Sequence, residues 1–218
     1  MVKIFPSLIS SNLLELHTTL ELLDPFVGGY HIDIMDFHFV PNLTWGPDFV
    51  TAICGATRKQ LFIHLMVEFP EKYLPLLRLS KGDIVSIHYE SPSSLSLEAL
   101  CNEISRQGWI PSIALNPETP LTVIYDLPFL QHLLLMSVHP GFSGQKFIPS
   151  TLEKLAEAHA FKKQASRPFT LAVDGGIDEH TCSSLVKRGA DQLAIATAIF
   201  KDGNPREAVQ RIQKACEC

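Results

Sequence analysis

The sequence lacks several features that define large classes of protein. Only 19% of its 218 residues are charged and 46% are hydrophobic, whereas an intrinsically disordered chain combines low hydrophobicity with a high net charge. No window of 18 apolar residues is present, and the N-terminus lacks the apolar core of a signal peptide. We therefore predict a globular protein that is cytoplasmic and has no membrane partner.

Long runs of basic residues are also missing, since none exceeds a pair such as Lys162-Lys163. The 18 Lys and Arg residues and 23 Asp and Glu residues give a net charge of −5. A nucleic-acid surface shows a basic stripe, so we expect no nucleic-acid partner. The five cysteines form no CxxC pair, which favours reduced thiols over a disulfide scaffold.

What the sequence does contain is an alternation of short strand-like runs with longer amphipathic stretches. The predicted strands are Lys3–Ile9, Tyr30–Met35, Leu61–Val67, Ile84–Tyr89, Ile110–Leu115, Leu133–Val138, Phe169–Val173 and Leu193–Thr197. The predicted helices are Asn12–Leu23, Asp48–Ala56, Pro70–Leu79, Ser96–Arg106, Pro120–Asp126, Pro149–Gln164, Glu179–Lys187 and Pro205–Lys214.

Eight strand–helix units of about 27 residues each use up the whole chain. Alternating strands and helices imply a parallel sheet, and eight units imply closure into a (β/α)8 TIM barrel. We therefore predict an α/β protein with one compact barrel domain over residues 1–218. An open doubly wound sheet is the alternative, although the GxGxxG turn that often accompanies it is absent.

Polar residues stand at the ends of three predicted strands, where barrel enzymes carry their chemistry. Side chains alternate along a strand, so His31 and Asp33 share a face that leaves Ile32 and Ile34 on the helix-covered side. His64 ends the third strand in the same manner, and Asp174 ends the seventh. Two imidazoles and two carboxylates form a plausible set of ligands for a divalent metal. Each could instead be an ordinary hydrogen-bonded polar residue of the barrel.

Glycines follow the late strands, where barrels often bind phosphate between loops. They lie in Gly141-Phe142-Ser143-Gly144 and Gly175-Gly176, and Ala196-Thr197 ends the last strand. Glycine lets backbone N–H groups approach an anion, although a tight turn would explain it equally well.

Three methionines, Met35, Met66 and Met136, end strands that carry these motifs. They either fill the core or form an apolar collar around the metal site. His88 and Glu90 end the fourth strand, and His88 could orient a ligand or simply be a satisfied polar residue. His17, His132, His159 and His180 are expected on the surface.

The sequence resembles the ribulose-phosphate 3-epimerase family over nearly its whole length. The resemblance is carried by Pro6-Ser7, the segment from His31 to Thr44, His64-Leu-Met66-Val67, Leu115-Asn116-Pro117, the segment from Met136 to Gln145, and Val173-Asp174-Gly175-Gly176-Ile177. The sequence departs from the family pattern at Phe37, Ser143 and Ala196, where the family usually has glycine.

The resemblance implies a barrel in which His31, Asp33, His64 and Asp174 hold one divalent metal ion, and Asp33 and Asp174 act as the acid and base. The ligand set admits Zn, Fe(II), Mn or Co. Substrate contacts are implied for Ser7, His64, Gly141, Phe142, Ser143, Gly144, Asp174, Gly175, Gly176, Ala196 and Thr197. A homo-oligomer is implied as well.

The implied reaction is the inversion of C3 of a phosphorylated ketose, through an ene-diolate that the metal stabilises. D-ribulose 5-phosphate, converted to D-xylulose 5-phosphate, is the expected substrate, and D-allulose 6-phosphate is the closest alternative. A sugar-phosphate-binding barrel without catalysis, damaged at Phe37, is an alternative from another class. The D-x-K-x-x-D motif of related decarboxylases is excluded because Met35 stands where the lysine belongs.

Overall fold

The computed structural model describes residues 2–217. Its eight strands are β1 (Lys3–Pro6), β2 (Gly29–Met35), β3 (Gln60–Met66), β4 (Ile84–His88), β5 (Ile110–Leu115), β6 (His132–Met136), β7 (Thr170–Asp174) and β8 (Gln192–Ile195). The α-helices are α1 (Leu16–Leu23), α2 (Pro47–Ala56), α3 (Leu97–Arg106), α4 (Thr151–Gln164), α5 (Cys182–Lys187), α6 (Thr197–Phe200) and α7 (Pro205–Cys216). Six 3₁₀ turns are η1 (Leu8–Ser10), η2 (Leu13–Glu15), η3 (Asp24–Phe26), η4 (Pro70–Lys72), η5 (Leu74–Leu76) and η6 (Leu121–Ile124).

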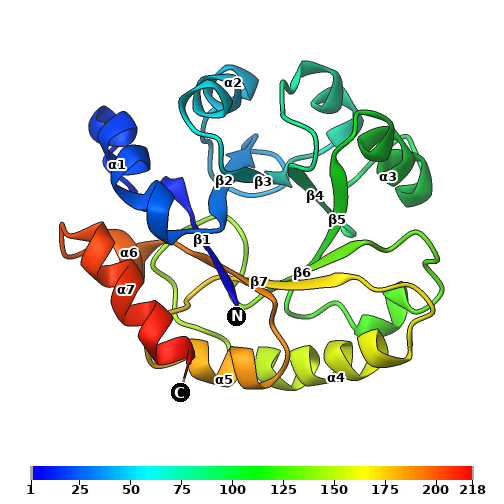
Figure 1. Ribbon diagram of the computed structural model, residues 1–218. Coiled ribbons are helices and arrows are strands. Elements are labelled where there is room, and N and C mark those ends of the chain that lie inside the picture. Colours follow the sequence, from blue (N-terminus) through cyan, green and yellow to red (C-terminus); the bar gives the residue numbers. More distant parts are fainter. Residues whose placement is uncertain (1, 218) are drawn as a thin grey trace.

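All eight strands run parallel in one sheet with the order β1-β8-β7-β6-β5-β4-β3-β2. The remaining seam, between β1 and β2, is bridged by an isolated parallel pair, Ser7 and His31. The helices surround the strands on the outside (Figure 1). The sheet is therefore a nearly closed (β/α)8 barrel, and the predicted fold class is confirmed.

Alternation along the strands sorts the apolar side chains into two sets, as predicted. Ile32 and Ile34 belong to the large outer core, in which strand residues pack against helix residues such as Leu20 and Val50. A smaller inner core fills the barrel itself and contains Phe5, Phe62, Ile84, Ala114, Leu134, Met136 and Ala172. The polar residues of the inner face are thus positioned by the same two-residue period that buries the isoleucines.

Some helical segments begin with a side-chain cap. Asn12 accepts a hydrogen bond from Leu14 N (3.1 Å), and Ser96 accepts one from Ala99 N (3.2 Å) at the start of α3. Side-chain oxygens at this position satisfy backbone N–H groups that have no partner inside the helix. After Asn12 the chain first forms η2, so that α1 begins at Leu16 rather than directly after the cap.

The helix predicted over Pro70–Leu79 is wrong. The segment forms two 3₁₀ turns, η4 and η5, separated at Tyr73. Pro75 has no N–H to donate, and its ring would collide with the carbonyl of Glu71 in an α-helix. Likewise, the predicted helix Pro120–Asp126 is only the 3₁₀ turn η6, and the predicted strand Lys3–Ile9 ends at Pro6 before η1.

The surface position predicted for His132 is also wrong. His132 is the first residue of β6, and alternation turns it inward together with Leu134 and Met136. Its ring lies at hydrogen-bond distance from Ser112 Oγ (Nδ1, 2.8 Å) and Gln192 Oε1 (Nε2, 3.0 Å). Burial lowers the pKa of His132 to about 4. His132 is therefore a satisfied histidine inside the barrel.

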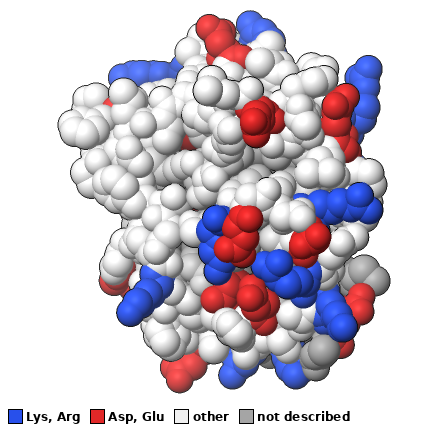
Figure 2. All heavy atoms as spheres, turned by 90° about the vertical axis from the view of Figure 1, so that its left-hand side faces the viewer, with Lys and Arg blue, Asp and Glu red and all other residues white. Residues whose placement is uncertain are grey.

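Basic and acidic side chains are interspersed on the face of the molecule drawn in Figure 2. Within residues 2–217 no helix has the length and apolar character needed to cross a membrane. Cys54, Cys101, Cys182 and Cys216 are free thiols, and Cys218 lies outside the described residues. The cytoplasmic location stays a prediction.

Candidate active site

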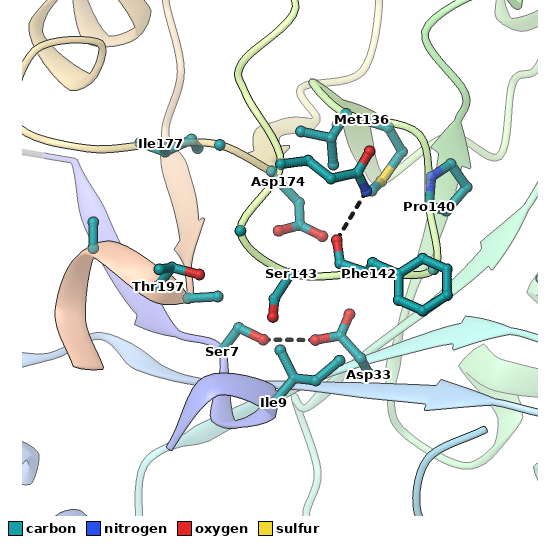
Figure 3. Close-up of a pocket in the computed structure, with 18 of the residues that line it drawn as sticks. Ser7, Ile9, Asp33, Met136, Pro140, Phe142, Ser143, Asp174, Ile177 and Thr197 are labelled. Carbon is teal, nitrogen blue, oxygen red and sulfur yellow. Dashed lines mark hydrogen bonds between the residues drawn. The ribbon is translucent and has the colours of Figure 1, made fainter. Parts of the chain in front are cut away.

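A pocket of about 190 Å³ opens at the carboxyl ends of the strands. It is lined by Ser7 after β1, by Asp33 at the end of β2, and by residues of the loops that follow β6, β7 and β8. Figure 3 shows Asp33 and Asp174 pointing into it, with the Ser7 hydroxyl donating to Asp33 Oδ2 (2.6 Å). The pocket therefore lies at the carboxyl ends of the strands, which is the end of a barrel where catalytic residues are expected.

Beneath the pocket the two predicted histidines meet the two aspartates. Ligand atoms of His31, Asp33, His64 and Asp174 all lie within 4.8 Å of one another. Asp33 and His64 are register partners on β2 and β3, which explains why both lie at the same level of the barrel. Both imidazoles are fully buried, whereas the carboxylates face the pocket. The sequence expectation that these four side chains converge matches the geometry.

Electrostatics within this group favour the ionised form of Asp33 and the protonated form of His64. Burial by itself raises the pKa of Asp33, but attraction to His31 and hydrogen bonding to His64 hold it well below its usual range. Burial lowers the pKa of His64, but its interactions with Asp174 and Asp33 outweigh burial and raise the pKa to about 9. Two carboxylates inside the barrel therefore attract positive charge.

His31 provides the test of whether a metal ion fits. Both of its ring nitrogens are buried without a hydrogen-bond partner. They lie near carboxylate oxygens, Nδ1 at 3.4 Å from Asp33 Oδ2 and Nε2 at 4.0 Å from Asp174 Oδ2. Buried polar atoms in native proteins nearly always have partners. An unpartnered imidazole next to two carboxylates fits the donor set that divalent transition metals bind.

The loop after β6 forms one wall of the pocket. Gln145 Nε2 donates to the carbonyls of His139 (2.6 Å) and Phe142 (2.9 Å), which closes the loop on itself. Asn42 Nδ2 donates to Gly141 O (2.6 Å) and so ties this loop to the one after β2. The predicted substrate contacts of this loop, which are Gly141, Phe142, Ser143 and Gly144, all line the pocket.

The turn after β7 depends on two glycines with positive φ, Gly175 (112°) and Gly176 (63°). A Cβ on Gly176 would lie 2.5 Å from Phe147 N, so only glycine fits this close approach. Ser137, which the sequence reasoning missed, donates its hydroxyl to the carbonyls of Asp174 and Gly175 and fixes the same turn. Its position directly after Met136, at the end of a strand that carries a motif, could have pointed to it.

Most other predicted substrate contacts also line the pocket, but His64 does not. Ser7, Gly175, Gly176, Ala196 and Thr197 are among the lining residues. His64 is fully buried below them, so its predicted contact with substrate finds no support in the geometry. Met35, Met66 and Met136 are buried and also line the pocket, which gives the site an apolar wall.

Two further features change the sequence-based picture. Lys201 lines the pocket and is the only Lys or Arg among the described residues that do so. It was missed, although it stands four residues after Thr197, directly after the short helix α6. Phe37 does adopt the positive φ (65°) that glycine would accept more readily, but its side chain is 65% exposed and does not line the pocket.

The fold is that of a TIM barrel with a pocket at the carboxyl ends of its strands, and comparisons with solved structures agree on the fold. Similar solved structures include orotidine 5'-monophosphate decarboxylase from Sulfolobus solfataricus (TM-score 0.69, 13% identity, covering 100% of this chain and 98% of that one). Another is 3-hexulose-6-phosphate synthase from Salmonella typhimurium (TM-score 0.66, 14% identity, covering 99% of both chains). At such low identity these likenesses establish the fold alone.

Sequence comparison then gives the family. The model of the ribulose-phosphate 3 epimerase family matches residues 3–200. The ribulose-phosphate 3-epimerase of Bacillus subtilis is 36% identical over 98% of this chain and 99% of its own length. The chloroplastic enzyme of Arabidopsis thaliana is 34% identical over 95% of this chain and 75% of its own length. The chain belongs to the ribulose-phosphate 3-epimerase family and is an isomerase of that type.

Proposed function

We propose that this chain interconverts D-ribulose 5-phosphate and D-xylulose 5-phosphate by metal-dependent epimerisation at C3. Membership of the family supports the reaction, since the related proteins are named ribulose-phosphate 3-epimerases. The observation that carries the mechanism is the pair of carboxylates, Asp33 from β2 and Asp174 from β7, that both face one pocket. A phosphorylated ketose is therefore the proposed substrate.

Inversion of a carbon centre by proton exchange needs one group that removes a proton and another that delivers one from the opposite side. Asp33 and Asp174 serve in these two roles. Ser7 donates to Asp33 Oδ2 and holds that carboxylate in position. Ser137 does the corresponding work at β7 by fixing the backbone of Asp174.

In this mechanism His31, Asp33, His64 and Asp174 would hold one divalent cation, since their ligand atoms all lie within 4.8 Å of one another. When bound, such an ion acts as a Lewis acid that stabilises negative charge developing on the oxygens of the substrate. Met35, Met66 and Met136 limit the access of water to the reacting carbon. The loops after β6 and β7 bind the phosphate through backbone N–H groups of their glycine-rich turns, and Ala196-Thr197 after β8 lies beside them in the pocket.

The test replaces each carboxylate with its amide. Asp33→Asn and Asp174→Asn should each lower epimerisation by at least about 10²-fold, because each removes one proton-transfer group. In D₂O, a variant that keeps one functional carboxylate should exchange the C3 proton of only one of the two epimers. Asp178→Asn is the matched control: Asp178 also lines the pocket, but its Oδ1 accepts from His180 N and Thr181 N, as an amide oxygen can.

The assay should be run on protein supplied with Zn, Fe(II), Mn or Co, with pentulose and hexulose phosphates side by side. Near-normal rates in either Asp variant would overturn the two-carboxylate mechanism. Preference for D-allulose 6-phosphate would overturn the proposed substrate but leave the mechanism standing. Binding of sugar phosphate without turnover of either ketose would instead support a non-catalytic barrel.

A further inference from the structure

A chain of hydrogen bonds runs from His64 in the candidate metal site through His88, the last residue of β4, to Glu90 in the loop that follows. His64 Nε2 lies 2.9 Å from His88 Nε2, and His88 Nδ1 lies 3.1 Å from Glu90 Oε2. The two imidazoles are stacked, with centroids 5.0 Å apart and planes inclined by 25°. Both imidazoles are fully buried, and neither His88 nor Glu90 lines the pocket. These two residues therefore act on the site only through His64.

The directions of these hydrogen bonds follow from chemistry. An ionised carboxylate only accepts, so Nδ1 of His88 must carry the proton that it donates to Glu90. Nε2 of a neutral His88 then has a lone pair and accepts from the Nε2–H of His64. In a neutral His64 this leaves Nδ1 with a free lone pair. That atom is the one facing the site, 3.2 Å from Asp33 Oδ1 and 3.6 Å from Asp174 Oδ2.

The carboxylate at the end of the chain is itself fixed. Oε1 of Glu90 accepts from Asn116 N (2.8 Å) and from the hydroxyl of Thr119. Lys154 Nζ donates to Asn116 O (2.7 Å), which ties the loop after β5 to helix α4. The Phe39 ring packs on His88 with centroids 4.8 Å apart. Each imidazole therefore has one partner on each side and little room to rotate.

We propose that His88 and Glu90 are positioning residues that set the tautomer and orientation of His64, and thereby the affinity of the site for its divalent cation. The inference rests on the metal site of the proposed function and adds to it two residues that do not touch metal or substrate. Partners of this kind behind a metal-binding histidine typically contribute 10–100-fold in metal affinity.

Glu90→Gln gives a sharp test because it reverses the direction of donation in both hydrogen bonds, which then run from the introduced glutamine to His88 and from His88 to His64. The amide oxygen of the introduced glutamine must face Asn116 N, which can only donate, so the amide NH₂ faces His88 Nδ1. His88 then carries its proton on Nε2 and donates it to His64. The proton of His64 moves to Nδ1, the atom that should bind the metal. The substitution changes neither the size of the side chain nor the ligands themselves.

The measurement is Zn²⁺ affinity by competition with a chromogenic chelator, together with the ¹⁵N shifts of the imidazole nitrogens. We expect Glu90→Gln to bind Zn²⁺ about 10–100-fold more weakly than wild type. Thr119→Val, which removes one contact to Glu90 but keeps its carboxylate, should stay within about 3-fold. Glu90→Asp should recover part of the affinity lost in Glu90→Gln, because it restores an acceptor-only group.

Zn²⁺-loaded wild type should show His64 protonated at Nε2 and metal-bound at Nδ1, a readout that needs no variant to fold. The inference is overturned if His64 is instead protonated at Nδ1, or if Glu90→Gln binds Zn²⁺ as tightly as wild type. Both of these results leave the proposed function intact. Failure of wild type itself to bind any divalent ion would overturn the proposed metal site and the inference together.

Discussion

Phe37 shows how a single residue can be strained without lying in the site. Its φ of 65° is unfavourable for a residue with a side chain, by about 1–2 kcal/mol. Its N–H donates to Asn42 O (3.0 Å), which holds the turn after β2 in this conformation. Because the ring is largely exposed, little packing compensates for the strain.

We therefore expect Phe37→Gly to be more stable than Phe37→Ala by about 0.5–1 kcal/mol. Both variants remove the ring, but only glycine relieves the backbone, and the greater freedom of glycine in the unfolded chain offsets part of the gain. Urea denaturation measures the difference. Activity should be unchanged in both, and a gain of activity in Phe37→Gly would support the alternative in which Phe37 damages the site.

Lys201 supplies positive charge to a pocket that also holds Asp33, Asp174 and Asp178. A phosphorylated substrate brings two negative charges, so we expect Lys201→Met to raise KM about 3–10-fold without changing kcat. The side chain is exposed, so the effect should shrink as ionic strength rises. Steady-state kinetics at low and high salt measure it, with Lys163→Met on α4 as the control. An equal loss in Lys163→Met would show that net charge alone is responsible.

At the scale of elements, the turn η4 after β3 is tied to the loop after β4 by one carboxylate. Glu71 Oε1 accepts from Ser94 N (2.9 Å) and Ser94 Oγ (2.6 Å), and Oε2 accepts from Ser93 Oγ (2.8 Å). Burial raises the pKa of Glu71, but these hydrogen bonds outweigh it and lower the pKa from 4.5 to about 2. The folded state therefore binds the proton more weakly than the unfolded state does.

The stabilisation by Glu71 is fully present above pH 4.5 and is lost as the pH falls from about 4.5 to 2. We expect Glu71→Gln to lower the free energy of unfolding at pH 7 by less than about 1 kcal/mol, since the group is near the surface. The difference from wild type should shrink as denaturation is repeated at pH 4.5 and pH 3. Glu98→Gln, exposed on α3, is the control, and a difference independent of pH would contradict this account.

The elements themselves were largely predictable, because short apolar runs mark the strands and longer amphipathic stretches mark most of the helices. The failures have local causes. Pro75 interrupts the segment that the apolar periodicity predicted to be one helix. A periodicity averaged over a window of residues does not register the loss of one backbone N–H donor. His132 points inward because β6 begins one residue before the predicted start at Leu133. Its partners Ser112 and Gln192 come from other strands, which the local sequence does not reveal.

At the scale of the whole molecule, binding of an ion at the proposed metal site should stabilise the folded protein. A ligand that binds only the folded state at 100 times its Kd adds about 2.7 kcal/mol. For a protein of this size that corresponds to a rise in Tm of about 5–10 °C. We expect Zn²⁺ to raise the Tm of wild type in differential scanning fluorimetry and a chelator to reverse the rise. Asp174→Asn should lose most of the shift, and an equal shift in that variant would place the ion elsewhere.

The four-residue ligand group could be predicted because strand ends of a barrel meet in one place, whatever lies between them in sequence. That His88 could orient a ligand was one of two interpretations that the sequence left open. The chain of hydrogen bonds that continues to Glu90 could not be predicted, since it depends on ring orientations and on the backbone N–H of Asn116 in the loop after β5. Lys201 was not predicted to line the pocket, because the short helix α6 that precedes it begins at Thr197, where the last strand was expected to continue. The homo-oligomer and the extent of a single domain stay predictions.

The seam of the barrel has a consequence for how the protein is made. Within residues 2–217, β1 pairs along its length with β8, the last strand in chain order. It meets the β2 side at the Ser7–His31 bridge and at a hydrogen bond from Gly28 N to Ile4 O (2.9 Å). While the chain emerges from the ribosome, the strand partners of Ile4 and Phe5 on β8, about 190 residues further along, have not yet been made. Ser7, Asp33 and Thr197 lie around this junction. The pocket is therefore completed only after β8 and the residues that follow it, up to Lys201, have been made. A chain truncated before β8 would lack part of the site as well as that strand.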